Sequence, residues 1–353
     1  MKRLYEYDGI DLSRMFAAFL AVAVHTYPLS SVSVELNFIL VHVFGRTVVP
    51  FFMMTTGYFL LPKYFDRRGQ SFDAIFRFIG KLGLLYIGAT LLYLPVSIYT
   101  GYYSGDNVFF IFFRNLMIDG TFYHLWYLPA VILGVLIVYA MSRKCSLPLT
   151  FGVSAVLYLF GMLGDNYYGL TANIPILHTI YETGFQVFTY TRNGLFFAPV
   201  FLTMGALIAG QKRPLSKRIN TIGFIISMLF MSIEGMLLNH FDIPRHTSMY
   251  LALLPCMFFL FGLIKSHQGK RSFFMRDTSM WIYILHPLLI VALRGGARMI
   301  GLLDQLTQNS IIFFLLVSGL SLIFAALIGM REKKITRSKI THKYREDGSP
   351  GIS

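Results

Sequence analysis

The most regular feature of the chain is a succession of long apolar runs separated by short polar breaks. A helix of about 20 apolar residues, rising about 1.5 Å per residue, crosses a hydrocarbon layer about 30 Å thick. The pattern predicts about ten such helices, at residues 10–28, 36–61, 75–97, 122–141, 148–163, 193–209, 219–238, 248–264, 279–291 with some extension, and 311–330. We therefore expect an all-α integral membrane protein whose single transmembrane domain fills residues 1–330.

The basic residues decide the expected orientation. Cytoplasmic loops keep an excess of Lys and Arg, and here the excess falls on alternate breaks, from Lys2 and Arg3 to a basic segment at 331–353. Both termini are therefore expected in the cytoplasm, with 331–353 a disordered basic tail that touches anionic lipid headgroups. Asp11 and Arg14 interrupt the first run and no cleavage pattern follows, so we expect a retained helix rather than a signal peptide.

Composition agrees with a membrane as the solvent. Of the 353 residues, 55% are hydrophobic and 14% are charged, which is far more apolar than one soluble core needs. The net charge of +14 would fit a nucleic-acid-binding protein only if the basic residues gathered on one soluble face. They are spread between the apolar runs instead, so nucleic acid is not an expected partner. Cys145 and Cys256 lack metal-ligand spacing, and no metal site is expected.

Ionisable residues inside the predicted helices are the candidate functional groups, because a charge at membrane depth costs at least about 2.5 to 3.5 kcal/mol and needs a partner or an aqueous cavity. In the first helix, Arg14 and His25 are eleven residues apart. That spacing is about three turns, so both lie on one face about 16 Å apart. A guanidinium at one end can hold an anionic part of a ligand, while an imidazole at the other acts as a base. The alternative is a snorkelling Arg and an interfacial His.

Four further polar residues share the outer half of the predicted bundle when the helices are laid in alternating directions. They are Arg46, His124, Arg192 and Glu234. Together with His25 they are expected to line one externally facing chamber and to bind substrate; interfacial solvation is the alternative for the last three. For His286, a structural role is favoured over catalysis, because Pro287 leaves a backbone carbonyl one turn earlier without its N–H partner.

At these residues the chain resembles the acyltransferase 3 family of membrane proteins, which acylate cell-surface glycans and other acceptors. The spacing of Arg14 and His25 is similar to the first-helix motif of that family. The strings VPFFMMTTGYFLL (49–61), YHLWYL (123–128) and IYILHP (282–287) also resemble it, as do ten helices with both ends inside. The resemblance implies an O-acyltransferase in which His25 and Arg14 are catalytic, acyl-CoA (acetyl-CoA) is the donor and an extracytoplasmic hydroxyl is the acceptor.

Within that family the chain resembles the membrane portion of VanT-type serine racemases, through LLYLPVSIYTG, DGTFYHLWYLPA and TRNGLFFAPVFL. Such a protein continues into a soluble racemase domain, and nothing resembling that domain follows Arg331. We therefore expect either a standalone relative or the membrane part alone. The resemblance implies a separate racemase or cell-envelope enzyme as a partner, besides membrane lipid and a small-molecule or glycan acceptor.

The expected binding site for the acyl-CoA phosphates departs from the family pattern. The third helix of the family commonly opens on an Arg-rich motif that ends in Pro, whereas this chain reads FRFIGKLGLLY. Arg77 and Lys81 are one helical turn apart and are expected to face the same phosphate. Arg67 and Arg68 lie close by in sequence and complete the expected donor site.

Three functional classes remain open from the sequence. The first is the membrane acyltransferase, in a bacterial-type plasma membrane that the chain crosses several times. The second is a domain of VanT type that supplies or transports serine or another amino acid without acyl transfer, although no inverted repeat with broken helices is evident. The third, an anchor or sensor without chemistry, leaves the buried Arg and His residues unexplained.

The topology is directly testable. Reporter fusions at Gly105 and Gly269 should land on opposite sides of the membrane, because the alternation of basic breaks puts the first outside and the second inside. Alkaline phosphatase and green fluorescent protein activities of the two fusions report the side. Both fusions on one side would contradict the predicted arrangement.

Overall fold

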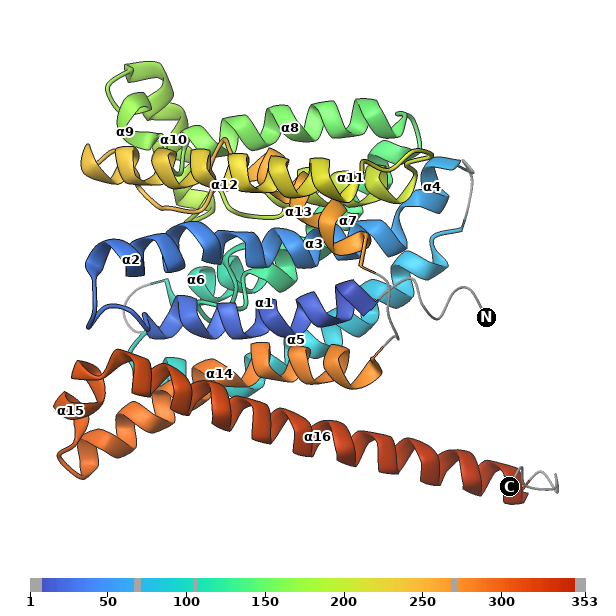
Figure 1. The fold of residues 1–353 in the computed structure, drawn as a ribbon, viewed down its shortest axis with the longest axis vertical. Helices are drawn as coiled ribbons and strands as arrows, with labels where there is room; N and C mark the ends of the chain where they lie inside the picture. The colour runs from blue at the N-terminus through green and yellow to red at the C-terminus, as the bar shows by residue number, and fades with distance from the viewer. Residues whose placement is uncertain (1–7, 67–70, 104–106, 268–271, 347–353) are drawn as a thin grey trace. The chain divides into compact units, whose positions relative to one another are not determined.

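The computed structural model describes residues 8–66, 71–103, 107–267 and 272–346. Throughout these ranges the regular secondary structure is helical, with no strand (Figure 1). Six spans in them are long and apolar enough to cross a membrane: α1 (Asp8–Thr26), the interrupted span Val34–Leu60, α5 (Asp73–Tyr99), α12 (Lys217–His240), α14 (Phe273–Met299) and the apolar part of α16 (Ser310–Glu346). The chain is thus a helical membrane protein.

Four shorter apolar helices occupy the remaining expected runs: α7 (Tyr127–Ser142), α8 (Leu147–Leu163), α11 (Ala198–Ala209) and α13 (Leu253–Lys265). Three of them begin later than the hydrophobic pattern predicts. Irregular segments at 120–126, 188–197 and 241–252 precede α7, α11 and α13. Hydropathy does not separate a helix from irregular backbone that is buried in protein, which a membrane protein tolerates.

The second expected helix is interrupted near its middle. It consists of α2 (Val34–Phe38), a π-helical turn (Ile39–Val43), a 3₁₀ turn (Phe44–Thr47) and α3 (Val48–Leu60). Arg46 lies in the 3₁₀ turn. Such turns inside a longer helix often mark functional sites. The remaining short elements are α4 (Pro62–Asp66), α6 (Val108–Arg114), a π-helical turn (Asn115–Asp119), α9 (Tyr168–Thr171), α10 (Pro175–Val187) and α15 (Leu303–Gln308).

The chain divides into two compact units, of which the first comprises residues 1–37 and 267–353. In this unit α1, α14 and α16 pack side by side (Figure 1). Their shared core contains the buried side chains of Ala18, Val22, Ile282, Ile290, Phe313 and Val317. The Ser310 hydroxyl donates to the carbonyl of Pro28 and joins the end of α1 to the start of α16.

Helix α16 continues to Glu346. The disordered tail expected from Arg331 is therefore not what the structure has over 331–346, because a polar, basic sequence with few helix breakers can extend a helix beyond its apolar part. Residues 347–353 of the expected tail lie outside the described residues.

The second unit comprises residues 38–266 and is built around α11. Nearly every residue of α11 is buried, and the helix packs against α3, α7, α8 and α13. A helix that is apolar on all sides belongs in the interior of a bundle. The polar segments that lead into α11 and its neighbours are partly buried in the same unit.

The crossing of α3 and α11 depends on two glycines. A Cβ atom at Gly57 would collide with the carbonyl oxygen of Leu202, and one at Gly205 would collide with the carbonyl oxygen of Met54. Each helix therefore has a glycine at the point where it contacts the backbone of the other. Small residues that allow such close backbone contact are typical of helix packing in membranes, where dispersion rather than the hydrophobic effect drives association.

We expect Gly57→Ala and Gly205→Ala each to destabilise the protein by about 1 to 3 kcal/mol, because the backbone atoms that they meet cannot move aside as a side chain would. Thermal denaturation in detergent micelles measures the loss. Gly83→Ala in α5 is the matched control, since a Cβ there meets no atom within 4 Å. If all three variants had the same melting temperature, the close crossing would not be required for stability.

Candidate functional site

The structure pairs Arg14 with a carboxylate that the sequence did not single out. Arg14 and Asp11 lie one turn apart on α1, and Nη1 donates to Asp11 Oδ1 at 3.0 Å. The other carboxylate oxygen accepts from the backbone N–H of Ser272 at 3.2 Å. Asp11 is buried, while 17% of the Arg14 side chain remains exposed. The buried carboxylate thus fixes one edge of the guanidinium and compensates its charge.

His25 stacks on His286 of α14 within the same unit. The two ring centroids are 5.4 Å apart and the planes are inclined by 25°. His286 Nδ1 lies 3.0 Å from the carbonyl oxygen of Ile282, and because a carbonyl only accepts, this nitrogen carries a proton. His286 also interacts with the backbone of Tyr283, whose carbonyl Pro287 leaves without an N–H partner. These backbone contacts are the ones expected for a structural role of His286, and its ring packs against that of His25.

In the second unit, Arg46 joins a polar cluster with His42 and Thr247. Arg46 Nη2 donates to Thr247 Oγ1 and to His42 Nδ1, both at 3.1 Å. Because a guanidinium has no acceptor, His42 Nδ1 must be the unprotonated nitrogen of its ring. The Thr247 hydroxyl lies 2.9 Å from the same nitrogen. The cluster therefore links the 3₁₀ turn of the interrupted helix to the irregular segment 241–252.

Arg192 lies between two aromatic rings. Its guanidinium carbon is 4.9 Å from the ring centre of Trp126 and 4.6 Å from that of Tyr190. Its Nε is buried without a hydrogen-bond partner. Burial lowers the pKa of Arg192 to about 10, and the neighbouring charge of Arg46 acts in the same direction. Arg192 remains a cation at neutral pH, held by rings rather than by a carboxylate.

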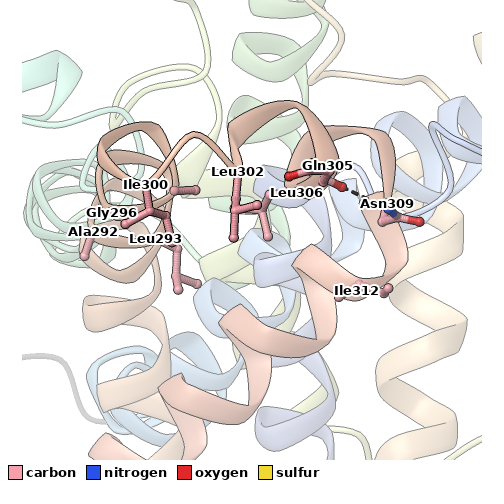
Figure 2. Close-up of a pocket in the computed structure, with 10 residues that line it drawn as sticks. Ala292, Leu293, Gly296, Ile300, Leu302, Gln305, Leu306, Asn309 and Ile312 are labelled. Atoms are coloured by element: carbon pink, nitrogen blue, oxygen red, sulfur yellow. Dashed lines mark hydrogen bonds between the residues drawn. The ribbon is translucent and has the colours of Figure 1, made fainter.

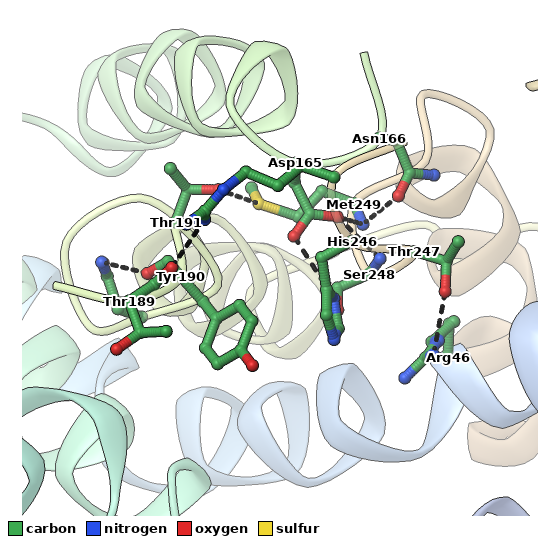
Figure 3. Close-up of polar contacts among 12 residues, drawn as sticks. Arg46, Asp165, Asn166, Thr189, Tyr190, Thr191, His246, Thr247, Ser248 and Met249 are labelled. Carbon is green, nitrogen blue, oxygen red and sulfur yellow. Dashed lines mark hydrogen bonds and ion pairs between the residues drawn. The ribbon is translucent and has the colours of Figure 1, made fainter. Parts of the chain in front are cut away.

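Asp165 organises the irregular segment that carries His246 (Figure 3). Its Oδ1 accepts from the backbone N–H groups of Ser248 at 2.7 Å and Met249 at 3.0 Å. Its Oδ2 lies 3.6 Å from His246 Nδ1, which is 2.6 Å from the Ser248 hydroxyl. Burial, aided by the charge of Arg192, lowers the pKa of His246 to about 4 although Asp165 opposes the shift. His246 is therefore neutral at physiological pH.

Glu234 binds the backbone of the irregular segment 241–252. Its Oε1 accepts from the Tyr167 hydroxyl at 2.8 Å and from the Leu251 N–H at 2.6 Å, and Oε2 accepts from the Ala252 N–H at 2.9 Å. These two backbone groups lie immediately before α13, so the carboxylate fixes the segment that leads into that helix. A substrate-binding role for Glu234, as expected from its depth, would require these bonds to be exchanged.

His124 is buried among aromatic rings. Its ring centre lies 4.9 Å from that of Tyr93, 5.8 Å from that of Phe122 and 5.6 Å from that of Tyr123, all in edge-on contacts. It shares the irregular segment 120–126 with Trp126, the ring that covers Arg192. The segment thus carries one expected site residue and supports a second.

The expected donor-site residues divide between described and undescribed parts of the chain. Arg77 and Lys81 are exposed on the first turns of α5 and lie one turn apart, as the sequence predicts. Arg67 and Arg68 lie outside the described residues. The structure therefore offers two exposed cations at the start of α5 for an anionic group.

The structure brings some expected site residues together and leaves others in separate units. Arg46 and Arg192 are close enough to interact electrostatically, together with His246. Arg14 and His25 belong to the first unit, whereas Arg46, His124, Arg192 and Glu234 belong to the second. A chamber that includes His25 with the residues of the second unit stays a prediction.

Three residues that hold the polar clusters together are not predicted by the sequence: Asp11, Asp165 and His246. In the sequence, Asp11 is visible only as a charged interruption of an apolar run. Asp165 and His246 lie in breaks between apolar runs, where polar residues are expected and do not indicate a site. The available signal was the density of polar residues in GDN (164–166) and PRHTS (244–248).

A groove of about 600 Å³ is present in the first unit, between α14, α15 and α16 (Figure 2). Its walls are mostly apolar, including Leu293, Ile300 and Leu306, with polar atoms from Gln305 and Asn309. None of the residues that line it is titratable. The groove therefore has no group for acid–base chemistry, and the candidate site lies elsewhere.

Comparison with known proteins gives the chain a family. The model of the acyltransferase 3 family, described as an acyltransferase domain, matches residues 7–330. An amino-acid racemase of Enterococcus faecalis is 35% identical over 344 residues, or 97% of this chain and 48% of the relative. A second from that organism is 37% identical over 336 residues, covering 94% and 47%. A serine/alanine racemase of Enterococcus gallinarum is 36% identical over 329 residues, covering 92% and 46%.

The chain spans about half the length of these curated relatives. No solved structure matches the chain. The family model covers nearly all of the described residues, including both units and every polar cluster described above. The resemblance inferred from the first-helix Arg and His is confirmed, and the chain belongs to the acyltransferase 3 family of membrane proteins.

Proposed function

We propose that the protein is a membrane O-acyltransferase that moves an acyl group, most simply acetyl, from a cytoplasmic acyl-CoA to a hydroxyl of an extracytoplasmic acceptor such as a cell-surface glycan. The observation that carries the proposal is the acyltransferase domain over residues 7–330, combined with Arg14 and His25 about three turns apart on α1. About ten helices would cross a bacterial plasma membrane, with both termini in the cytoplasm. Residues 1–330 would form the catalytic domain and 331–353 a cytoplasmic extension.

His25 is the proposed general base. It accepts the proton of the acceptor hydroxyl as that oxygen attacks the thioester carbonyl; the carbon–sulfur bond then breaks and the CoA thiolate leaves, taking a proton in turn. The stacked ring of His286, 5.4 Å away, restricts the rotation of the His25 ring. A base held in one orientation loses less entropy on reaching the reactive geometry.

Arg14 is the proposed anchor for the donor. Asp11 holds Nη1, so the guanidinium is oriented before the donor arrives, and a guanidinium is suited to bind a phosphate or carbonyl oxygen. Arg77 and Lys81 on α5 would add charge for the CoA phosphates, together with Arg67 and Arg68. Arg46, His124 and Arg192 would contact the acceptor.

A second function has one specific observation in its favour. The curated relatives are named for amino-acid and serine/alanine racemases, so this chain could supply or transport serine for a separate racemase or cell-envelope enzyme. In that case the arginines of the second unit would contact the amino-acid carboxylate. The first function is preferred because the family model is an acyltransferase domain and because transport alone gives His25 and Arg14 no chemical task.

Replacing His25 by Ala should lower kcat by about 10² to 10⁴, the usual contribution of a general base. Replacing Arg14 by Ala should chiefly raise the apparent KM for acetyl-CoA, because it removes a binding contact far from the reacting carbonyl. Labelled acetyl transfer by purified protein in liposomes measures both. The double variant should lose less than the product of the two single effects, since both residues serve one bound donor.

Two exposed residues give matched controls. His240→Ala and Arg298→Ala remove the same side-chain types from helix ends that carry no proposed role, and both should leave transfer unchanged. Thermal melting of every variant confirms folding. Full transfer by folded His25→Ala protein, or uptake of serine without any acylated product by the unmodified protein, would overturn the proposal in favour of supply or transport.

A further inference from the structure

We propose that the groove between α14, α15 and α16 binds one hydrocarbon chain of a membrane phospholipid, whose ester carbonyl accepts a hydrogen bond from the Gln305 amide. The groove has a volume of about 600 Å³, which is the size of ligand sites in proteins. The inference goes beyond the proposed function, because none of the residues that line the groove is assigned a part in acyl transfer.

The position of the groove along the chain places it at one surface of the membrane. Its walls come from the end of α14, from α15 and from the first turn of α16. The apolar spans on either side of α15 are Phe274–Met299 and Ser310–Arg331, so residues 300–309 connect two spans at one boundary of the hydrocarbon layer. Phospholipid chains begin at this boundary, where the hydrocarbon layer meets the polar headgroup region.

The groove is continuous with an apolar surface of the spanning helices. Ile300 and Ile312 line the groove and are 70% and 53% exposed. Leu315 and Leu316 are exposed as well, and they lie three and four residues after Ile312, which puts all three on one face of α16. An exposed apolar face of a membrane span is in contact with lipid chains. A chain on this face can therefore enter the groove without leaving the hydrocarbon layer.

The groove has an apolar part and a polar part. Figure 2 shows Leu293, Gly296 and Ile300 toward one end, and Gln305 with Asn309 toward the other. None of the described residues that line the groove is charged. The matching ligand therefore has a long apolar portion and a neutral polar group at one end, as a phospholipid chain has with its ester.

Gln305 supplies the hydrogen-bond donor at the polar end. The side-chain amide of Asn309 donates to the backbone carbonyl of Gln305 at 2.9 Å, so the NH₂ group of Asn309 is engaged within the protein. The Gln305 side chain is exposed at the groove, and its amide carries two N–H donors. An ester carbonyl only accepts, so it complements this amide.

The hydrogen bond gives the groove its preference for an ester lipid. Lipid tails are as apolar as leucine side chains, so a chain gains little from the hydrophobic effect when it leaves the bilayer for the groove. Dispersion contacts with the walls and the bond to Gln305 remain as the favourable terms. Filling the groove and removing the amide should therefore have separable effects on lipid binding.

Native mass spectrometry of the full-length protein in detergent counts the lipids that stay bound. The probes are dioleoylphosphatidylcholine and its dialkyl ether analogue, which has no ester carbonyl. Gly296→Phe places a ring in the groove, and a Cβ at this position meets no atom within 4 Å. Gly295→Phe is the matched control, because a Cβ there also meets no atom within 4 Å but the residue does not line the groove.

We expect one saturable ester lipid on the unmodified protein and on the Gly295→Phe protein, and loss of this lipid from the Gly296→Phe protein. Gln305→Leu should weaken binding of the ester lipid by about 2- to 10-fold, the scale of one neutral hydrogen bond, and should leave binding of the ether lipid unchanged. Gln308→Leu is the control on the same short helix, since Gln308 lies outside the groove.

Four results would each overturn the inference: no saturable lipid on the unmodified protein, full retention by folded Gly296→Phe protein, equal loss from the Gly295→Phe protein, or a Gln305→Leu effect that is absent or equal for both lipids. A dimer that only Gly296→Phe disrupts would assign the groove to a second copy of the chain and would also contradict it. Thermal melting verifies folding of every variant.

A second measurement needs no variant. A phospholipid with a photoreactive diazirine in its chain is added to the unmodified protein, and the crosslinked peptides are identified. Labelling should include residues 292–312, and labelling confined to other spans would contradict the inference. Neither measurement depends on acyl transfer, so the groove and the proposed function can fail independently.

Discussion

Every cation inside a membrane-spanning bundle has to be compensated without bulk water, and this constraint explains most of the polar architecture. In the first unit, Arg14 is stabilised by a carboxylate one turn away: Asp11 accepts a hydrogen bond from Arg14 and another from the backbone of Ser272. In the second unit, Arg192 is stabilised by two aromatic rings. The first arrangement pairs the cation with an adjacent carboxylate, whereas the second covers both faces of the guanidinium with aromatic rings.

The compensating groups are carried on irregular backbone, and the packing of α11 makes that backbone possible. While α11 is surrounded by protein, the segments 120–126, 188–197 and 241–252 that precede α7, α11 and α13 are only partly buried in the same unit. Their backbone groups find partners within the unit, as when Asp165 accepts from Ser248 and Met249. The close crossing at Gly57 and Gly205 therefore supports the site indirectly, by keeping α3 and α11 together.

The sequence predicted the helical class and the positions of the apolar runs, since length and hydropathy are enough to identify them. It also placed Arg14 and His25 on one face of the first helix, because their spacing is about three turns. It did not predict the late starts of α7, α11 and α13, which are set by tertiary contacts of irregular backbone. Partnerships such as Asp165 with His246, or His25 with His286, join residues that are far apart in sequence and follow no local pattern. The depth of Glu234 likewise did not predict its bonds to the backbone of Leu251 and Ala252, and its substrate contact stays a prediction.

The central claim is that acyl transfer runs from one side of the membrane to the other along α1. Sealed proteoliposomes with uniform orientation, acetyl-CoA enclosed on the cytoplasmic side and the acceptor supplied only outside test it directly, with labelled product and free CoA quantified in each compartment. The account predicts acetylated acceptor outside and one equivalent of free CoA inside. Product that forms only when donor and acceptor are on the same side would contradict it.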